Sequence, residues 1–463
     1  MHKLFCEVLS KIPDYKEFLT LEELDESSRR LALKYPDRVK LFEMGRTRDD
    51  HPLLCLKIGR GSKNALLFGC PHPNEPIGTM MLEFLTQELA QNDELLEALD
   101  YTWYVVKAWD ADGLRLNEGW LKGPYTIYNY SRNFFRPAGH KQVDWTFPID
   151  YKELHFNAPI PETQAMMSLI DAIRPHFIYS LHNAGFGGTY WYISRDIPAV
   201  YDAMRKASGD VEVPLNLGEP EAPYCELLSP AIYKSLGIRD EYDFMERYGI
   251  KNIPEIIKVG TCSENYARER HNSFTLLTEL PYFTDPRIMD SSESTVTRRE
   301  AITRKLDMSR KHNDFILSMM AKTRSFIDPE NPFLLALDAF TENKSDESTR
   351  RMIEDPAFLR MATVAEEFDN LLISQFYKTL SFGMLIRMNE YELERMAKTG
   401  EQNDDKKNLL KSVAAECEIA HGELTGKLEK EIHYSVIPIK KLVYIQLACG
   451  LLVANHLHKK ISD

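Results

Sequence analysis

Cysteine is scarce in this sequence, and its arrangement argues against a disulfide framework. Seven cysteines are spread over 463 residues, their number is odd, and no two are spaced as Cys-x-x-Cys. Several stand inside apolar runs, where a thiol packs as a small hydrophobic side chain. We therefore expect a reduced protein in the cytoplasm.

Long hydrophobic runs are missing as well. Residues 1–7 hold no apolar stretch of the length that a signal peptide needs. The most apolar segment, 442–457, is shorter than the about 20 residues of a membrane-spanning helix, and Lys440 and Lys441 precede it directly. We expect no export and no membrane partner, and we interpret 442–457 as a buried helix.

Positive charge is in deficit. Lysine and arginine together number 57 against 70 aspartates and glutamates, which gives a formal net charge of −13. Because an acidic surface repels phosphate backbones, we exclude nucleic acid as a general partner. The hydrophobic share of 43% is that of an ordinary globular protein, and 463 residues are long for a single core. Two domains are the natural expectation.

Short apolar runs alternate with helical patterns through the first two thirds of the chain. Four such runs suit strands that are buried on both faces of a sheet: 65–70, 103–108, 177–181 and 274–280. Helical patterns at 77–89 and 161–173 lie between them. This alternation predicts an α/β sandwich around a largely parallel sheet.

The pattern changes at about residue 290, where strand signals largely vanish. Four later segments are predicted to be helices: 291–325, 356–398, 405–432 and 437–460. We predict an α/β domain over residues 1–329 and an all-helical C-terminal domain over 330–463. The apolar stretch 442–457 must be buried somewhere, either in that domain's own core or in a homo-oligomer formed through the C-terminal helices.

Two metal ligands follow the first strong strand. His72 and Glu75 form an HxxE pair, and Pro73 and Pro76 place it on a loop rather than within a helix. His182 comes directly after the apolar run 177–181. Ligands of open α/β sheets bind at the carboxyl ends of the strands, where both histidines are expected. Imidazole and carboxylate suit zinc, so we predict a single Zn²⁺ held by these three residues.

A fourth polar residue stands near the end of a buried strand. Glu279 lies among the apolar residues of the run 274–280. A carboxylate in such surroundings costs free energy unless it has a partner or a function. We predict that Glu279 is the catalytic carboxylate, which accepts a proton from the metal's water.

These residues, in this order, resemble the zinc carboxypeptidase family (carboxypeptidase A-like metallopeptidases). The segment Asp110-Ala111-Asp112-Gly113 is similar to the family's NPDG turn, and Ser131-Arg132-Asn133-Phe134 is similar to its NRNF segment. The resemblance covers roughly residues 15–290. It implies an α/β/α sandwich with a mixed, mainly parallel sheet.

The resemblance also implies roles for several substrate-binding residues. Arg132 would grip the substrate's terminal carboxylate, with Ser131 in place of the family's asparagine and Arg136 as a rival anchor. The family's oxyanion-stabilising arginine has no counterpart at its usual spacing, and Arg115 is our candidate for that role. Tyr266 is the candidate for the family's mobile tyrosine. The segment 219–260 is interpreted as an insertion that shapes or covers the pocket.

The resulting hypothesis is a zinc metallocarboxypeptidase that hydrolyses the C-terminal amide bond of an intracellular peptide or modified peptide. One alternative is an N-acyl amino acid amidohydrolase that resembles the desuccinylases and aspartoacylases. The other is a metal-binding protein without catalysis, motivated by Ser131 and by the missing arginine. The expected partner is accordingly a peptide or an N-acyl amino acid.

Overall fold

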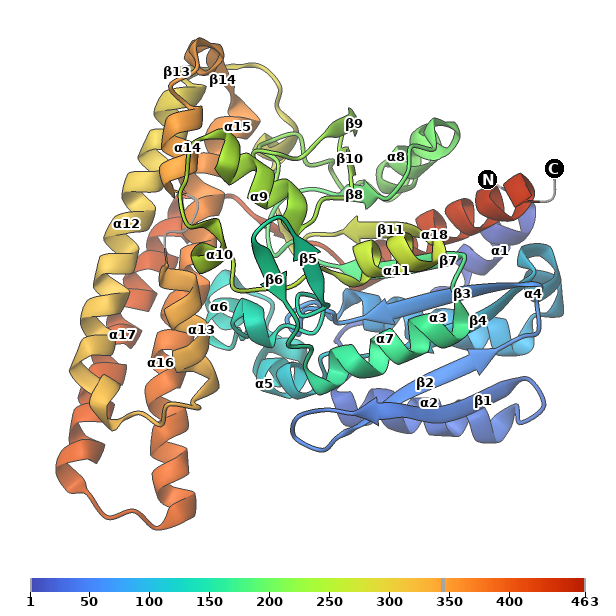
Figure 1. Ribbon diagram of the computed structural model, residues 1–463, viewed down its shortest axis with the longest axis horizontal. Helices are drawn as coiled ribbons and strands as arrows, with labels where there is room; N and C mark the ends of the chain where they lie inside the picture. The colour runs from blue at the N-terminus through green and yellow to red at the C-terminus, as the bar shows by residue number, and fades with distance from the viewer. Residues whose placement is uncertain (1, 343–345, 462–463) are drawn as a thin grey trace.

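A nine-stranded sheet forms the centre of the larger part of the molecule (Figure 1). The computed structural model describes residues 2–342 and 346–461. The strand order is β1-β2-β4-β3-β7-β11-β8-β10-β9. The strands are β1 (Val39–Arg46), β2 (Pro52–Ile58), β3 (Lys63–Gly69), β4 (Tyr101–Val106), β7 (Phe177–His182), β8 (Tyr190–Ile193), β9 (Leu227–Ser229), β10 (Ile232–Lys234) and β11 (Phe274–Glu279).

The sheet is mixed, with a parallel centre. Strands β4, β3, β7 and β11 run parallel to one another, and β8 and β10 form a further parallel pair. The pairs β1–β2, β2–β4, β11–β8 and β10–β9 are antiparallel. All six residues of β7 are buried, which explains why its sequence is a continuous apolar run rather than an alternating one. The predicted mixed, mainly parallel sheet is confirmed.

Helices cover both faces of this sheet. Successive residues of β3 belong to different hydrophobic clusters: Leu67 packs with α3 and α18, and Leu66 packs with α7 and α11. Since neighbouring side chains of a strand point to opposite faces, the two helix pairs form two separate layers. The layers are α3 (Ile77–Gln91) with α18 (Ile439–Ile461), and α7 (Pro161–Ile173) with α11 (Ser263–His271). This is the predicted α/β/α sandwich.

The apolar stretch 442–457 lies in α18, which packs on the sheet and on α3 and α8 (Tyr201–Gly209). Tyr179 of β7 donates a hydrogen bond to the Gln446 carbonyl, at 2.8 Å. A Cβ at Gly450 would lie 2.7 Å from the Tyr179 ring, so glycine permits this close approach. The stretch is therefore buried within the chain itself, against the sheet and not among the other C-terminal helices.

Three long helices stand side by side beside the sandwich (Figure 1). They are α12 (Arg298–Thr323), α16 (Ser374–Thr399) and α17 (Asp404–Glu431). The first of them precedes the predicted boundary at residues 329 and 330, and α18 follows it but lies on the sheet. The division into 1–329 and 330–463 stays a prediction. Two sets of contacts cross that boundary: α12 packs with α16 and α17, and α18 packs with α3 and α8.

The predicted helix over 356–398 is interrupted in its first part. Met361–Thr363 forms strand β14, which pairs with β13 (Glu293–Thr297). Thr363 then caps α15 (Val364–Phe368), with Glu366 completing a capping box. One π-helical turn, Asp369–Ile373, connects α15 to α16. Because of this turn the helix changes its winding where it faces the sandwich.

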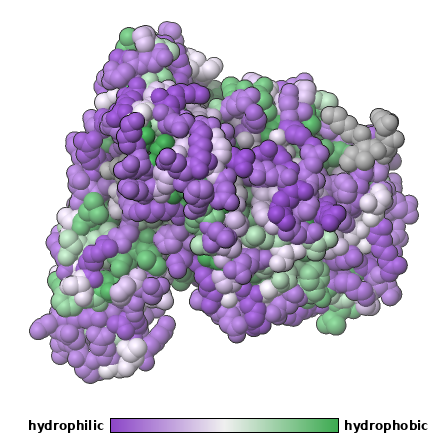
Figure 2. Space-filling view, viewed as in Figure 1, coloured by the Kyte–Doolittle hydropathy of each residue, from purple (hydrophilic) through white to green (hydrophobic). Residues whose placement is uncertain are grey.

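The remaining elements are shorter and connect these layers. They are α1 (Lys3–Ser10), α2 (Leu21–Lys34), α4 (Asp93–Leu99), α5 (Ala111–Leu121), α6 (Ile127–Arg132), β5 (Ile149–Tyr151), β6 (Leu154–Phe156), α9 (Ile238–Arg247), α10 (Ile253–Ile256), β12 (Phe283–Thr284), α13 (Pro332–Thr341), α14 (Asp346–Met352) and β15 (Ser435–Val436). Figure 2 shows a mostly hydrophilic face over the helices and the sandwich. Within the described residues, every helix is too short or too polar to cross a membrane.

Candidate metal centre

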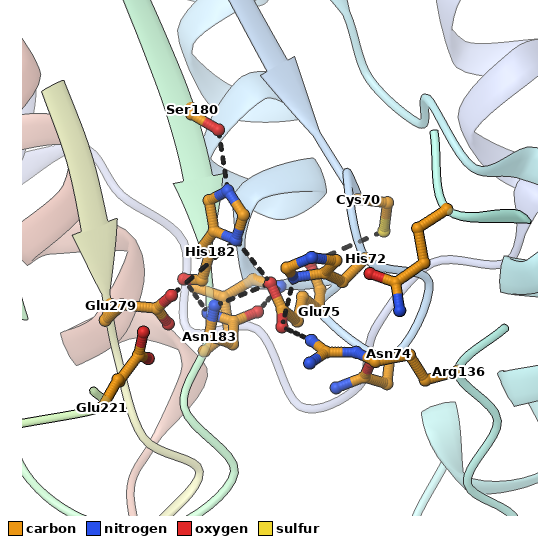
Figure 3. Close-up of polar contacts among 12 residues, drawn as sticks. Cys70, His72, Asn74, Glu75, Arg136, Ser180, His182, Asn183, Glu221 and Glu279 are labelled. Carbon is orange, nitrogen blue, oxygen red and sulfur yellow. Dashed lines mark hydrogen bonds and ion pairs between the residues drawn. The ribbon is translucent and has the colours of Figure 1, made fainter. Parts of the chain in front are cut away.

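His72, Glu75 and His182 meet at the carboxyl edge of the sheet (Figure 3). One ligand atom from each lies within 4.8 Å of the others. His72 Nδ1 is 3.0 Å from Glu75 Oε1, and His182 Nδ1 is 3.0 Å from Glu75 Oε2. The predicted cluster is therefore present as a compact group of two imidazoles and one carboxylate.

The loop after β3 places the first two ligands. Cys70 has a positive φ of 48°, which turns the chain away from the strand. A Cβ at Gly69 would lie 2.7 Å from the Lys107 carbonyl, so glycine is required where the loop begins. Pro76 ends the loop as the N-cap of α3. The side chains of His72 and Glu75 thus project from one short loop toward the end of β7, where His182 lies.

The donor set fits a zinc ion. His182 Nε2 is 2.8 Å from Ser180 Oγ, whereas the buried His182 Nδ1 faces the cluster and lies next to the Glu75 carboxylate. Burial, with Arg136 nearby, lowers the pKa of His72 to about 4, so its imidazole is neutral, as a metal ligand must be. Two imidazole nitrogens and one carboxylate are a typical catalytic zinc set.

Glu75 is held as a carboxylate by its neighbours. Burial alone would raise the pKa of Glu75, but His72 and Arg136 outweigh it and lower that pKa. Its Oε2 also accepts a hydrogen bond from the Asn183 backbone N–H, at 3.2 Å. The ligand is therefore oriented and charged before any ion binds.

Glu279 lies beside the third ligand. It ends β11 directly opposite His182 of β7, and its Oε1 is 3.7 Å from His182 Nδ1. Its side chain is buried, and its Oε2 has no hydrogen-bond partner among the described residues. Burial, followed by the charges of Glu221 and Glu75, raises the pKa of Glu279 well above its usual range. A carboxyl group of this kind is suited to exchange protons near neutral pH.

Arg136 is the arginine that reaches the cluster. Its guanidinium contacts the Glu75 carboxylate, and its Nε is 3.1 Å from Asn74 Oδ1. From the sequence, Arg136 is expected only as a rival to Arg132. The structure places Arg136 in the cavity next to the ligands.

Arg132 and Ser131 point elsewhere. The Arg132 side chain forms ion pairs with Glu390 of α16 and Glu418 of α17, at 2.6 and 2.8 Å. Ser131 Oγ is 2.8 Å from His421 Nε2 in a fully buried contact. Both residues belong to α6, which the long helices cover. The structure does not bring Arg132 to the metal centre, because its guanidinium is bound by two glutamates of the long helices. Its expected grip on a substrate stays a prediction without geometric support.

Arg115 and Tyr266 are also away from the centre. Arg115 lies on α5, with its Nη2 3.0 Å from His51 Nδ1. The Tyr266 hydroxyl donates to Asp171 at 2.8 Å, and its ring packs against Phe147. Neither residue lines the cavity that contains the ligands. The structure does not bring them to the metal centre, so the roles expected for them have no geometric support.

A cavity of about 610 Å³ opens onto the metal centre. His72, Glu75 and Glu279 line one part of it, and Glu219, Pro220 and Glu221 of the predicted insertion line another. A further wall comes from the helical region, through Lys305, His312, Tyr377 and Lys378. The position of the insertion agrees with its expected role. The helical wall was not foreseen, because no local motif marks these residues.

The sandwich and the His–Glu–His cluster together define an α/β protein with a candidate catalytic metal centre. A family model described as zinc carboxypeptidase matches residues 24–286, which is more than half of the chain. The chain therefore belongs to the zinc carboxypeptidase family.

Solved structures similar to this chain include two carboxypeptidases. Carboxypeptidase A from Helicoverpa armigera is 13% identical, with 60% of this chain and 70% of that chain covered and a TM-score of 0.39. A metallo-carboxypeptidase from Burkholderia cenocepacia is 16% identical, with 56% and 59% covered and a TM-score of 0.33. No curated protein matches the sequence.

Proposed function

We propose that this protein is a zinc metallocarboxypeptidase that hydrolyses the C-terminal amide bond of a peptide or modified peptide. The observation that carries the proposal is the buried Glu279 carboxyl, which faces the three ligands at the end of the neighbouring strand. Membership of the zinc carboxypeptidase family supports the class of reaction. The free thiols of all seven cysteines support a substrate in a reducing, cytoplasmic compartment.

The chain supplies the ligands and the proton carrier. Zinc bound by His72, Glu75 and His182 supplies Lewis-acid activation of a water and of the scissile carbonyl. Glu279 accepts the proton from the attacking water and returns it to the leaving amine. Its buried position keeps bulk water from competing for that proton.

Arg136 is proposed to stabilise negative charge on the reacting substrate. A guanidinium can donate two parallel hydrogen bonds to an anionic oxygen pair or to a developing oxyanion. Arg136 already contacts Glu75, so a substrate carbonyl at the centre lies within its reach. Arg132 is engaged by two glutamates of the helical region and is not proposed for this role.

The size of the cavity also favours a second candidate, an N-acyl amino acid amidohydrolase. Residues of α12 and α16 form one wall of the cavity, whose volume is about 610 Å³. This lies within the range of sites that enclose a small ligand. A substrate of few residues therefore fits better than the C-terminus of a folded protein. An N-acyl amino acid is also small enough for this cavity.

Metal content and hydrolysis measured together test the proposal. We expect about one zinc per purified chain, loss of that zinc in His182→Ala, and release of C-terminal amino acids from short peptides. The exposed His155 offers a matched control, since His155→Ala removes an imidazole outside the cavity. Zinc with hydrolysis of N-acyl amino acids alone would support the second candidate. Zinc with no hydrolysis of either class would indicate a metal-binding protein without catalysis.

A further inference from the structure

The insertion brings a carboxylate to the catalytic residue. Glu221 lines the cavity, and Figure 3 shows its carboxylate turned toward Glu279. Two buried tyrosines of β8 hold it: Tyr190 donates a hydrogen bond to Oε1, and Tyr192 donates one to Oε2 at 3.2 Å. Tyr190 is the residue paired with Glu279 across β8 and β11. Glu221 is therefore fixed in place beside the reacting centre.

Glu221 has no cationic side chain paired with it in the part of the chain that the structure describes. Within residues 2–342 and 346–461, no lysine, arginine or histidine forms an ion pair with it, although Glu219, two residues earlier, pairs with Arg298 at 2.6 Å. Asp369, a further carboxyl group of the cavity, accepts the Glu219 backbone N–H at 2.7 Å. Glu221 thus lies in the cavity wall with tyrosine hydroxyls as its hydrogen-bond partners and with its carboxylate turned toward Glu279.

The opposing group is also incompletely satisfied. Glu279 is buried, and no group within residues 2–342 and 346–461 forms a hydrogen bond with its Oε2. Glu221 is exposed to solvent while Glu279 is buried, and the two carboxyl groups face each other. Two facing carboxylates repel, and a cation between them removes that cost. The tyrosine ring of Tyr377 lines the same part of the cavity and adds an aromatic surface of the kind that favours organic cations.

We propose that Glu221 binds a cationic nitrogen of the substrate close to the bond that is cleaved. This inference rests on the proposed function and specifies its substrate class. An ammonium or guanidinium group satisfies the geometry whether it is the free amino terminus of a short peptide or the side chain of a basic residue. The lysines of the cavity, Lys305 and Lys378, come from the helical wall and repel such a group toward Glu221.

Matched substrate pairs test this proposal and separate the two sources of charge. One pair is a dipeptide with a free amino group and its N-acetylated form, and the other is a peptide with lysine or norleucine next to the scissile bond. We expect kcat/KM to favour the charged member of one pair by about tenfold to a hundredfold, as for a hydrogen bond to a charged group. The pair that shows the preference identifies the source.

Variants at residue 221 then assign the preference. Glu221→Gln keeps the shape and lets the tyrosines donate to its carbonyl, and it is expected to bring the ratio of kcat/KM values close to one. Glu221→Lys is expected to reverse the preference toward neutral or acidic groups. Glu226→Gln is the control, because Glu226 is an exposed residue of the same insertion outside the cavity. Melting curves confirm that each variant is folded.

The outcomes distinguish this inference from the proposed function. Equal hydrolysis of charged and neutral substrates, or a preference that survives in both Glu221 variants, would overturn the role of Glu221 and leave the peptidase proposal standing. If the zinc-loaded protein cleaves no amide, the peptidase proposal fails. Calorimetric titration with lysine, norleucine and N-acetylnorleucine then still tests whether Glu221 binds a cation. Tighter binding of an amine, lost in Glu221→Gln, supports the cation subsite. Equal binding of the three ligands overturns it.

Discussion

His182 and Glu279 are direct neighbours in the register of two parallel strands, with His182 Nδ1 and Glu279 Oε1 separated by 3.7 Å. The backbone pairing of β7 and β11 therefore fixes the distance between a candidate metal ligand and the carboxyl group proposed for catalysis. Because both residues are buried at strand ends, their positions do not depend on a mobile loop. A site built on strands in this way holds its geometry before substrate arrives.

Replacing Glu279 separates metal binding from catalysis. Glu279→Gln preserves the shape of the side chain and removes the group that accepts the proton. We expect zinc content to stay at the level of the parent and kcat to fall by about 10²- to 10⁴-fold, the usual contribution of a general base. Elemental analysis and steady-state kinetics on the same preparation check this. Activity equal to the parent would remove Glu279 from the mechanism.

The two arginines are expected to respond differently to truncation. Arg136→Ala removes the guanidinium beside Glu75 and should lower kcat/KM by about 10²- to 10³-fold. Arg132→Ala should leave kcat/KM nearly unchanged and lower the free energy of unfolding by about 1 kcal/mol, since it breaks ion pairs with α16 and α17. A rise in KM confined to Arg132→Ala would instead restore the assignment made from the sequence.

Removal of the metal should destabilise the folded chain. An ion that binds only the folded state adds about 2.7 kcal/mol of stability when its free concentration is 100 times Kd. We expect the Tm of the zinc-loaded protein to fall after dialysis against a chelator and to recover when zinc is added back. His182→Ala should show neither change. If neither the chelator nor added zinc changes the Tm of the parent, the site makes no contribution to stability.

His421 predicts a pH dependence of stability. Burial, helped by Arg132, lowers the pKa of His421 in the folded state to about 4, from 6.5 for an exposed imidazole. The unfolded chain then binds more protons between these values, so stability is complete above about pH 6.5 and is lost as the pH falls toward 4. Chemical denaturation across this window should show a loss of about 1 to 3 kcal/mol. His421→Asn should show a smaller loss.

Gly383 tests whether the helical wall supports the cavity. A Cβ at this position of α16 would overlap the Ser131 carbonyl of α6, so Gly383→Ala must push the two helices apart. We expect a lower Tm and, because α16 carries Tyr377 and Lys378 of the cavity wall, a raised KM. Gly422→Ala in α17 is the control, since nothing lies within 4 Å of a Cβ there. Equal kinetics in the two variants would detach the wall from substrate binding.

The candidate metal centre could be predicted because the end of each buried strand is visible in the sequence as the end of an apolar run. The apolar runs before His72, His182 and Glu279 mark where each strand stops, and parallel strands bring those ends to one edge. Arg132 shows the limit of this reasoning. Its local sequence is similar to a family motif, but its direction is decided by glutamates 258 and 286 positions away in the chain.

Other features had no local signal at all. An all-round apolar helix such as α18 must be buried, but its own sequence does not say against which surface. Likewise Tyr377 and Lys305 stand in helices whose pattern shows only amphipathic packing. Their place in the cavity follows from the way α12 and α16 dock beside the sandwich, which is a long-range property of the whole fold. The sequence predicts the insertion that contains Glu221 but gives no signal for a role of that residue.

The position of α18 constrains how this protein can be divided for study. The helix completes a hydrophobic layer of the sheet through Gly450 and Gln446, so a fragment cut after residue 329 exposes the apolar surface of β7 and α3. Such a fragment is expected to aggregate rather than fold. A better design deletes or shortens the segment that contains α12, α16 and α17 and joins α18 to the sandwich by a linker. During synthesis, the same topology delays closure of the sheet's core until α18 has emerged from the ribosome.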